Sequence, residues 1–437
     1  MDHARISRVV LSRRSQTIQN PLRFPLPVSA DGRSSIAPPA PLRGIDNSSF
    51  AHFSIVKRLP EILRRVLHDN TFPPGVEESL MRLHAEIPGT PLHPIDEKGA
   101  PDLDAWAAHI DNLDGENWLE VPWFFAETYF YRRIVAATGY LTKPLHHVDP
   151  FSYQKSAGLR TNRASIRRFA RVVEDALRER PLTQEAMGAL LAQSLWGNRA
   201  DLSLWAADDD DRGPLDQSDD HLFVDDRDRT ARLLRNHAPD ARLLFVADNA
   251  GLELVGDLCL IDGLLTGGIA SQVRIHVKSH PTFVSDAVHA DVGATITFLR
   301  DSINRHAQKL GGRLQEHVDA GRIAVEDDFY WTSPLPLWEM PARISEMMRE
   351  HDLTILKGDA NYRRMLGDRH WPYTTPTEVA TSYLPAPTLA LRTMKAEVAV
   401  GLSQNDMNRA ALSGQNWATS GEWGFVQLSS RGGSSSA

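Results

Sequence analysis

The pattern of apolar positions divides the chain into two parts with different predicted secondary structure. Between residues 50 and 200, apolar residues recur at steps of three and four, which predicts helices with one buried face. The clearest stripe comprises Ile55, Leu59, Ile62, Leu63 and Val66. After residue 240, short apolar runs such as Leu243–Ala247 and Val273–Val277 alternate with helix-like stretches. Continuous apolar runs of this length are typical of strands buried on both faces of a parallel sheet.

The alternation after residue 240 predicts an α/β fold. We expect a doubly wound, largely parallel sheet with helices on both faces, preceded by an α-helical N-terminal domain. The further expected strands are Ile323–Val325, Leu353–Leu356, Leu389–Leu391, Val398–Val400 and Gly424–Leu428. In such sheets ligands bind beyond the carboxyl ends of the strands, so chemistry is expected there.

The composition excludes several classes of protein. With 42% hydrophobic and 24% charged residues, the 437-residue chain is typical of soluble globular proteins. A single cysteine, Cys259, excludes an intramolecular disulfide framework and a cysteine-rich zinc site. No stretch approaches the roughly 18 apolar residues of a membrane span, and a net charge of −8 does not favour a nucleic-acid binder. We expect no nucleic-acid or membrane partner and a cytoplasmic location.

Oxygen-bearing side chains follow the first two predicted strands of the sheet. Asp248 and Asn249 come directly after the run that ends at Ala247, and Asp286 lies in the loop after Val277. Three hard oxygen ligands suit Mg²⁺ or Mn²⁺, whereas zinc prefers His and Cys. Helix capping and turn formation are the alternative roles for these residue types.

Cationic side chains follow two later strands. Lys357 leaves an apolar strand, and Gly358 permits a tight turn whose N–H groups can bind an anion. Arg392 and Lys395 lie between two further apolar runs, and a lysine supplies a point charge for phosphate. A surface lysine at a strand end is the alternative. A hard-metal site beside an anion site is the inventory of metal-assisted phosphoryl chemistry.

Four motifs in this order carry a family resemblance. They are Asp248-Asn249-Ala250-Gly251, Phe283-Val284-Ser285-Asp286, Lys357-Gly358-Asp359-Ala360-Asn361-Tyr362-Arg363 and Arg392-Thr393-Met394-Lys395. The chain resembles the metal-dependent damage-control phosphatases, in particular their sugar-phosphate branch marked by Arg-Thr-x-Lys, also called acidic-residue-methyltransferase-one-like. Residues 120–133 are similar to its N-terminal helical signature. The resemblance covers about residues 40 to 428.

The resemblance implies a phosphatase that uses a divalent metal (Mn²⁺ or Ni²⁺, with Co²⁺ or Mg²⁺ as alternatives). It implies sugar phosphate substrates, such as fructose 1-phosphate and fructose 6-phosphate, and a damage-control role in hexose phosphate metabolism. Asp248, Asn249 and Asp286 would be the metal ligands, and with Lys395 the catalytic residues. The substrate would contact these four and also Lys357, Gly358, Asp359, Ala360, Asn361 and Arg392.

Several assignments stay open. Asp359 is one candidate for the general base, and Ala360 stands where the family often has leucine. Pocket or core roles are equally compatible with Glu127, Arg132 and Arg363. The alternative function is S-adenosylmethionine-dependent methylation of protein glutamates, an activity also attached to this family, although the Asp-Asn-Ala-Gly turn has fewer glycines than methyltransferase loops. A non-enzymatic scaffold is the third class.

Charge completes the predicted organisation. Residues 1–44 carry a net charge of +5 and residues 201–230 a net charge of −8. A block of like charges repels itself and stays solvated. We expect a disordered tail, with a mitochondrial transit peptide as the alternative, then a helical domain, an acidic linker or loop, the α/β metal-dependent phosphatase domain and a second tail. Their respective bounds are 1–42, 43–205, 206–232, 233–430 and 431–437.

Overall fold

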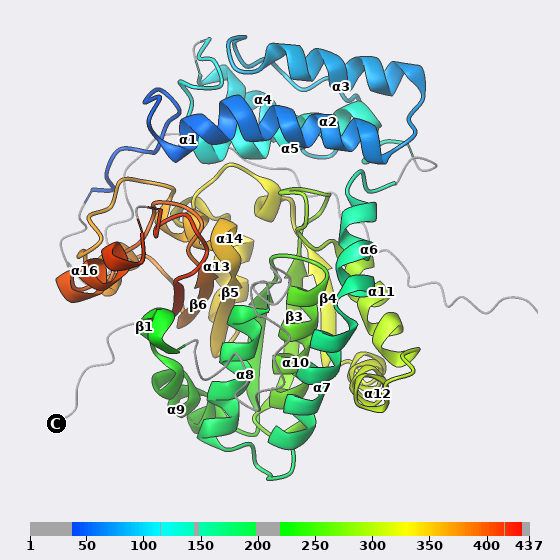
Figure 1. Ribbon diagram of the computed structural model, residues 1–437, viewed down its shortest axis with the longest axis vertical. Coiled ribbons are helices and arrows are strands. Elements are labelled where there is room, and N and C mark those ends of the chain that lie inside the picture. The colour runs from blue at the N-terminus through cyan, green and yellow to red at the C-terminus, as the bar shows by residue number, and fades with distance from the viewer. Residues whose placement is uncertain (1–36, 114, 144–147, 198–218, 415, 431–437) are drawn as a thin grey trace, which may run out of the picture.

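The computed structural model describes residues 37–113, 115–143, 148–197, 219–414 and 416–430. At its centre is a seven-stranded sheet in the order β1-β7-β6-β5-β2-β3-β4 (Figure 1). All neighbouring strands are parallel except β6 and β7, which are antiparallel. The strands are β1 Leu222–Asp225, β2 Ala241–Val246, β3 Ala270–Val277, β4 Ile323–Asp327, β5 Leu353–Lys357, β6 Thr388–Thr393 and β7 Gly424–Ser429. The predicted α/β fold with a largely parallel sheet is confirmed.

Alternate side chains of the central strands enter two separate cores, one on each face of the sheet. In β2, Leu243 and Phe245 belong to one hydrophobic cluster, and Leu244 and Val246 belong to the other. This is the two-residue period of a strand. Every residue of β5, β6 and β7 is buried, which explains why these strands read as continuous apolar runs.

Helices cover both faces. The first face is covered by α7 Arg163–Ala176, α8 Gln184–Trp196, α10 Leu252–Thr266, α11 His289–Arg300 and α12 Arg305–Asp319. The second is covered by α13 Ala342–Arg349 and α14 Gly358–Leu366. The core of this face continues into a helical layer, which consists of α1 Phe50–Phe53, η1 Ser54–Arg58, α2 Leu59–Asp69, α3 Pro74–Glu86, α4 Leu103–Asp111 and α5 Trp123–Thr138. Figure 1 shows this layer across the end of the sheet. The remaining elements are α6 Ser152–Thr161, η4 Asp219–His221, α9 Arg227–His237, η5 Phe329–Thr332, η6 Leu337–Glu339, α15 Thr377–Ala380 and α16 Gln404–Ser413.

The predicted N-terminal helices do not all belong to that layer. Helices α7 and α8 pack on α10 and share the core of the first face of the sheet. Part of the predicted helical domain 43–205 thus shares a core with the sheet, and the predicted domain boundaries at residues 205 and 232 stay a prediction. None of the helices in the described ranges is long and apolar enough to cross a membrane.

Two segments differ from the sequence prediction. Val398–Val400 is irregular rather than a strand, because the carbonyl groups of Ala396 and Val398 are bound by the side chain of Arg392 instead of a neighbouring strand. Within the expected acidic linker or loop 206–232, residues 219–232 form η4, β1 and part of α9, since Leu222 and Phe223 are buried at the edge of the sheet.

The remainder of the acidic block, residues 206–218, lies outside the described residues, as do residues 1–36 and 431–437 of the two expected tails. The last part of the first tail is docked on the protein: Pro39 accepts a hydrogen bond from Arg369, and the backbone N–H of Leu42 donates to Asp368.

The chain order places a switch point within the sheet. From β2 the chain continues through β3 and β4 on one side, and later through β5 and β6 on the other. The four sequence motifs begin at or after the ends of β6, β5, β2 and β3, which are consecutive neighbours in the sheet. In α/β sheets the crevice at such a switch point is the usual place for a ligand.

Candidate functional site

Backbone pairing brings the loops after β2 and β3 together. The N–H of Ala250 donates to the carbonyl of Ser285 at 2.7 Å, and the N–H of Ala287 donates to the carbonyl of Asp248 at 2.7 Å. Asn249 and Asp286 form an isolated antiparallel bridge between these two hydrogen bonds. The structure therefore places the three predicted metal ligands side by side.

Asp248, Asn249, Asp286 and the neighbouring Glu253 form a carboxylate cluster that is buried and crowded. Asp248 is 6% exposed and Asp286 is 1% exposed. The amide nitrogen of Asn249 donates to Asp248 Oδ2 and to Glu253 Oε2, both at 2.8 Å. Burial raises the pKa of Asp248 well above its usual value, and the negative charges of Asp286 and Glu253 raise it further. Burial also raises the pKa of Asp286, partly offset by Lys278.

Two buried oxygens of the cluster accept no hydrogen bond from the residues that the structure describes, Asp248 Oδ1 and Asp286 Oδ2. The second lies 3.0 Å from Lys278 Nζ and is compensated by that charge, whereas Asp248 Oδ1 has no such neighbour among these residues, and a buried charge without a partner is costly. Across the described ranges, no group of three or more His, Cys, Asp or Glu side chains is arranged to hold a metal ion. Asp248 and Asp286 supply two carboxylates, so a hard cation there would need further oxygens from Asn249, from water or from a ligand. The donor chemistry fits such a cation.

Two residues of this region were not predicted to belong to the site. Lys278 directly follows β3 and is buried, with Nζ 3.0 Å from Asp286 Oδ2 and 3.3 Å from the carbonyl oxygen of Ala247. Glu253 lies in the first turn of α10 and is bound by Asn249. The strand-end rule that identified Asp248 would also have indicated Lys278.

The loop that carries Asp286 has an unusual backbone. Phe283 and Val284 have φ values of 48° and 70°, a region that residues other than glycine rarely adopt and that is costly for a β-branched side chain. The ring of Phe283 packs on Phe124 and Tyr131 of α5, with centroid distances of 5.8 and 5.2 Å. Such strain persists where surrounding contacts hold it, often at functional sites.

Helix α14 begins in direct contact with the carboxylate cluster. Gly358 has φ +83°, and a Cβ at this position would lie 1.8 Å from Asp248 Oδ2. Only glycine allows the start of α14 to approach Asp248 this closely. The contact joins the ends of β2 and β5, at the switch point of the sheet.

The side chain of Lys357 is bound by buried groups of the protein rather than directed toward a ligand. Its Nζ donates to the carbonyl of Ser194 and lies 3.0 Å from Asp257 Oδ1 and 3.5 Å from Glu253 Oε1. Although burial alone would lower the pKa of Lys357, Asp257 and Glu253 raise it. The predicted phosphate-binding role of this side chain stays a prediction.

The next residues of α14 have different surroundings. Asp359 Oδ1 accepts hydrogen bonds from Arg392 Nε at 2.7 Å and from the backbone N–H of Lys395 at 3.2 Å. Although burial acts to raise the pKa of Asp359, Arg392 and Arg363 lower it overall. Ala360 is half-buried. The side-chain amide of Asn361 donates to the carbonyl of Lys357 at 2.8 Å, and its buried Oδ1 accepts no hydrogen bond from the described residues.

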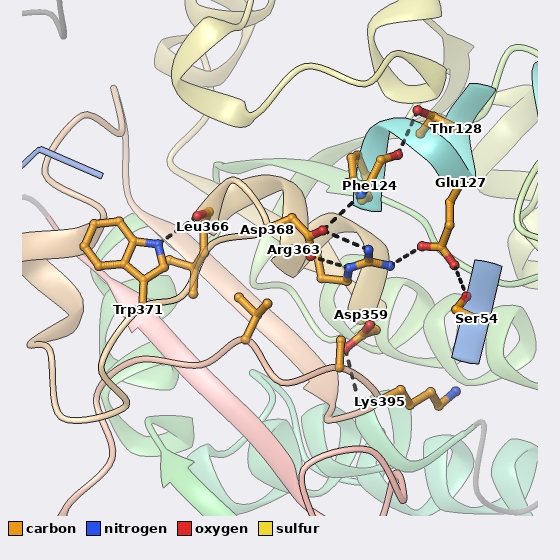
Figure 2. A network of polar contacts seen from close by, with 12 residues as sticks. Ser54, Phe124, Glu127, Thr128, Asp359, Arg363, Leu366, Asp368, Trp371 and Lys395 are labelled. Carbon is orange, nitrogen blue, oxygen red and sulfur yellow. Dashed lines mark hydrogen bonds and ion pairs between the residues drawn. The ribbon is translucent and has the colours of Figure 1, made fainter. Parts of the chain in front are cut away.

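Arg392 and Lys395 differ although they are three residues apart. Arg392 is fully buried, binds the carbonyls of Ala396 and Val398, and lies 4.3 Å from the ring centre of Tyr362. Lys395 is half-buried, and its charge lowers the pKa of Asp248. Its Nζ makes no hydrogen bond or ion pair with the residues that the structure describes. Figure 2 shows its side chain extending away from Asp359.

The three residues with open pocket or core roles are all buried in ion-pair clusters. Arg132 binds Asp102 with two hydrogen bonds, at 2.7 and 2.8 Å, and Glu97 with one at 2.7 Å. Arg363 binds Glu127 at 2.6 Å and Asp368 at 2.7 and 3.1 Å (Figure 2). The Arg132 cluster lies within the helical layer, whereas the Arg363 cluster joins that layer to α14.

Two cavities lie outside this region. One of about 460 Å³ lies beside α3 and α5, and is lined by Arg82, His93 and Arg133 among others. Another of about 230 Å³ is lined by residues that include Phe124, Leu335 and Arg364. Neither is lined by a predicted catalytic or substrate-binding residue.

Comparisons with known proteins give matches over most of the chain. The family model of the damage-control phosphatase ARMT1-like domain matches residues 46–410. The damage-control phosphatase ARMT1 of Danio rerio is 31% identical, over 90% of this chain and 97% of the relative. The Homo sapiens protein of the same name is 31% identical, over 89% and 98%. A solved DUF89 family protein from Pyrococcus horikoshii has a TM-score of 0.43 and 15% identity, over 79% of this chain and 92% of that one.

The family model and the relatives bear on the three classes of function that the sequence left open: phosphatase, methyltransferase and non-enzymatic scaffold. The family model spans most of the chain, and its name and those of the relatives describe a phosphatase. They do not favour the methyltransferase alternative, and they indicate an enzyme rather than a scaffold. The chain belongs to the ARMT1-like damage-control phosphatase family.

Proposed function

We propose that this chain is a divalent-metal-dependent phosphatase that hydrolyses sugar phosphate monoesters such as fructose 1-phosphate and fructose 6-phosphate. Its role would be damage control in hexose phosphate metabolism. The observation that carries the proposal is the buried pair Asp248 and Asp286, in which Asp248 Oδ1 accepts no hydrogen bond from the residues that the structure describes. Lys278 pairs with Asp286, so a bound cation would compensate the remaining negative charge at Asp248.

The proposed ligands of the cation are Asp248, Asn249 and Asp286. When bound, a divalent cation (Mn²⁺ or Ni²⁺, with Co²⁺ or Mg²⁺ as alternatives) supplies Lewis-acid polarisation of the phosphoryl group and neutralises its charge. Hard oxygen donors at the ends of β2 and β3 support this choice.

Lys395 is the proposed phosphate-binding residue. It is half-buried, electrostatically coupled to Asp248, and not engaged by the other described residues. Its position is fixed by the hydrogen bond from its backbone N–H to Asp359. Because Asp359 binds Arg392 and has a lowered pKa, it is better suited to hold this lysine in place than to act as a general base.

The substrate contacts proposed for Lys357–Asn361 involve the start of α14. The contact between Gly358 and Asp248 supports a ligand position above the switch point of the sheet. A small phosphorylated sugar would lie there, between the carboxylate cluster and Lys395. We propose a cytoplasmic location, and neither a nucleic acid nor a membrane as partner.

A phosphate-release screen tests the proposal. Fructose 1-phosphate, fructose 6-phosphate and a generic aryl ester, p-nitrophenyl phosphate, are offered with each of the four metals and with EDTA. We expect metal-dependent release from the sugar phosphates and its loss in EDTA and in Asp248→Ala. Full activity in EDTA or in Asp248→Ala would contradict the metal assignment, and release from the aryl ester alone would contradict the sugar assignment.

A further inference from the structure

Arg363 is the centre of a buried cluster that connects three segments distant in sequence. It lies in α14, and its guanidinium group binds Glu127 of α5 and Asp368, which follows the end of α14. It also stacks on the ring of Trp123, the first residue of α5, at 3.8 Å. Ser54 of η1 donates to the other oxygen of Glu127 at 3.1 Å. Figure 2 shows Ser54, Glu127 and Asp368 converging on Arg363 between the helical layer and α14.

Asp368 ties both helices to the same point. Its Oδ2 accepts hydrogen bonds from Arg363 and from the backbone N–H of Phe124, the latter at 3.1 Å. The N–H of Phe124 belongs to the first turn of α5, where N–H groups have no partner within the helix. The start of α5 and the end of α14 are therefore held by one carboxylate.

Helix α5 contacts both halves of the candidate site. Through Glu127 it holds Arg363, which lies one helical turn after Asp359 in α14. Through Phe124 and Tyr131 it packs on Phe283, in the loop that delivers Asp286. One rigid helix thus fixes the loop after β3 that carries Phe283 and Asp286 (the carboxylate loop) and the start of α14 relative to each other.

The chemistry of the cluster makes arginine specific at this position. The planar guanidinium group binds Asp368 with two hydrogen bonds, directs a third to Glu127 and stacks on an indole, which lysine cannot do at once. Removing one partner of such a buried cluster leaves an uncompensated charge, which is strongly destabilising.

We infer that Arg363 is a positioning residue: through Glu127 and Asp368 it sets α14 against α5, and so sets Gly358, Asp359 and Lys395 against the carboxylate loop. The inference rests on the proposed site but not on the identity of the sugar. A displacement of about 1 Å among reacting groups is enough to cost on the order of a hundredfold in rate.

The test compares Arg363→Lys and Arg363→Met with a matched control elsewhere in the fold. Arg313 of α12 binds the fully buried Asp262 of α10 through Nε and Nη2. Asp262 lies nine residues after Glu253 on α10, about 13 Å along the helix axis from the carboxylate cluster. Arg313→Lys therefore removes the same kind of two-nitrogen guanidinium contact away from the site.

Initial rates with Mn²⁺ are measured on fructose 1-phosphate and on p-nitrophenyl phosphate, together with Tm. We expect Arg363→Lys to lower kcat/KM on either substrate by about 30- to 100-fold, and Arg363→Met to lower it further. Arg313→Lys should lower Tm by a similar amount while kcat/KM stays within about threefold. Equal losses of kcat/KM in Arg363→Lys and Arg313→Lys at matched loss of Tm would overturn the inference.

Two further results keep the test decisive. If Arg363→Lys fails to fold, Glu127→Gln is judged by the same criterion, because it removes the charge that α5 presents to Arg363 and keeps the shape of the side chain. If the wild-type protein hydrolyses only the aryl phosphate, the sugar assignment fails, and the positioning inference is still decided on the aryl phosphate.

Discussion

The carboxylate half of the candidate site and its cationic half are stabilised in different ways. In the carboxylate half, Asp248 and Asp286 are buried together, and Oδ1 of Asp248 accepts no hydrogen bond within the described part of the chain. In the cationic half, Arg392 and Lys357 are fully engaged by carbonyl groups and carboxylates of the protein. Only Lys395 makes no such bond with the other described residues.

This difference indicates which half depends on a ligand. Crowded, partly unpaired carboxylates are stabilised by a bound cation, whereas cations already paired within the protein gain little from a bound anion. We therefore expect substitutions of the carboxylates to abolish activity and to relieve the repulsion between Asp248 and Asp286. Substitutions of the engaged cations, Lys357 and Arg392, should reduce the stability of the fold instead.

The largest expected effect belongs to Asp248→Asn. Loss of one ligand carboxylate should reduce phosphate release by roughly a thousandfold or more, because removal of a single electrostatic stabiliser alone costs about 10²–10³. In metal-free protein Tm should stay equal or rise, since the repulsion between Asp248 and Asp286 is removed. Paired activity assays and thermal melts check this, and a large fall in Tm with retained activity would contradict the role of the carboxylate.

Lys395→Met should have the next largest effect on activity. We expect kcat/KM to fall by about 10²-fold, with little change in Tm, because its Nζ makes no bond with the rest of the described protein. Steady-state kinetics and thermal melts measure both. An unchanged kcat/KM would exclude Lys395 as the phosphate-binding residue.

Lys357→Met tests the engaged cation. It leaves Asp257 and Glu253 without their buried partner, which should cost about 3–5 kcal/mol of unfolding free energy. Urea unfolding measures the loss. If stability is unchanged and only substrate binding weakens, the side chain serves the ligand rather than the fold.

A smaller expected effect is a pH dependence of stability that arises from a histidine in the loop that carries Asp286. His280 is fully buried, and burial, together with the charge of Arg132, lowers its pKa from about 6.5 to about 4. The unfolded state therefore binds the proton more readily than the folded state. The contribution of neutral His280 to the free energy of unfolding is complete above pH 6.5 and is lost as pH falls toward 4. The loss between pH 7.5 and pH 5 amounts to about 2 kcal/mol.

The comparison that isolates this contribution is between the wild-type protein and His280→Gln, which cannot take up the proton. Urea unfolding at both pH values should show a loss of stability on acidification that is smaller in His280→Gln by about that amount. The same loss in both proteins would show that His280 is not the group responsible.

Residue pattern alone predicted the parts of the site that depend on strand ends. The polar residues after β2 and β3 had to meet because parallel neighbouring strands end at the same edge of the sheet, and the structure brings Asp248, Asn249 and Asp286 together there. The same rule located Lys357 and Arg392, but not the direction of their side chains. The direction of Lys357 depends on Ser194 and Asp257, which are far from it in sequence. The direction of Arg392 depends on the irregular segment that follows β6, which turns the carbonyl groups of Ala396 and Val398 toward it.

The same limit explains the wrong prediction of a strand at Val398–Val400. The segment is apolar because it is buried, and the carbonyl groups of Val398 and Val400 are bound by the side chains of Arg392 and Gln427 rather than by a strand. Periodicity reports burial, and it does not report which group supplies the hydrogen bonds.

Manganese binding measured by isothermal titration calorimetry tests the central claim most directly. On metal-stripped wild-type protein we expect one Mn²⁺ per chain, and we expect Asp286→Asn to weaken that binding by at least tenfold while Lys357→Met, where folded, retains the stoichiometry. Wild-type protein that binds no divalent cation, or Asp286→Asn that binds Mn²⁺ as tightly as wild type, would contradict the assignment of the carboxylate pair as the metal site.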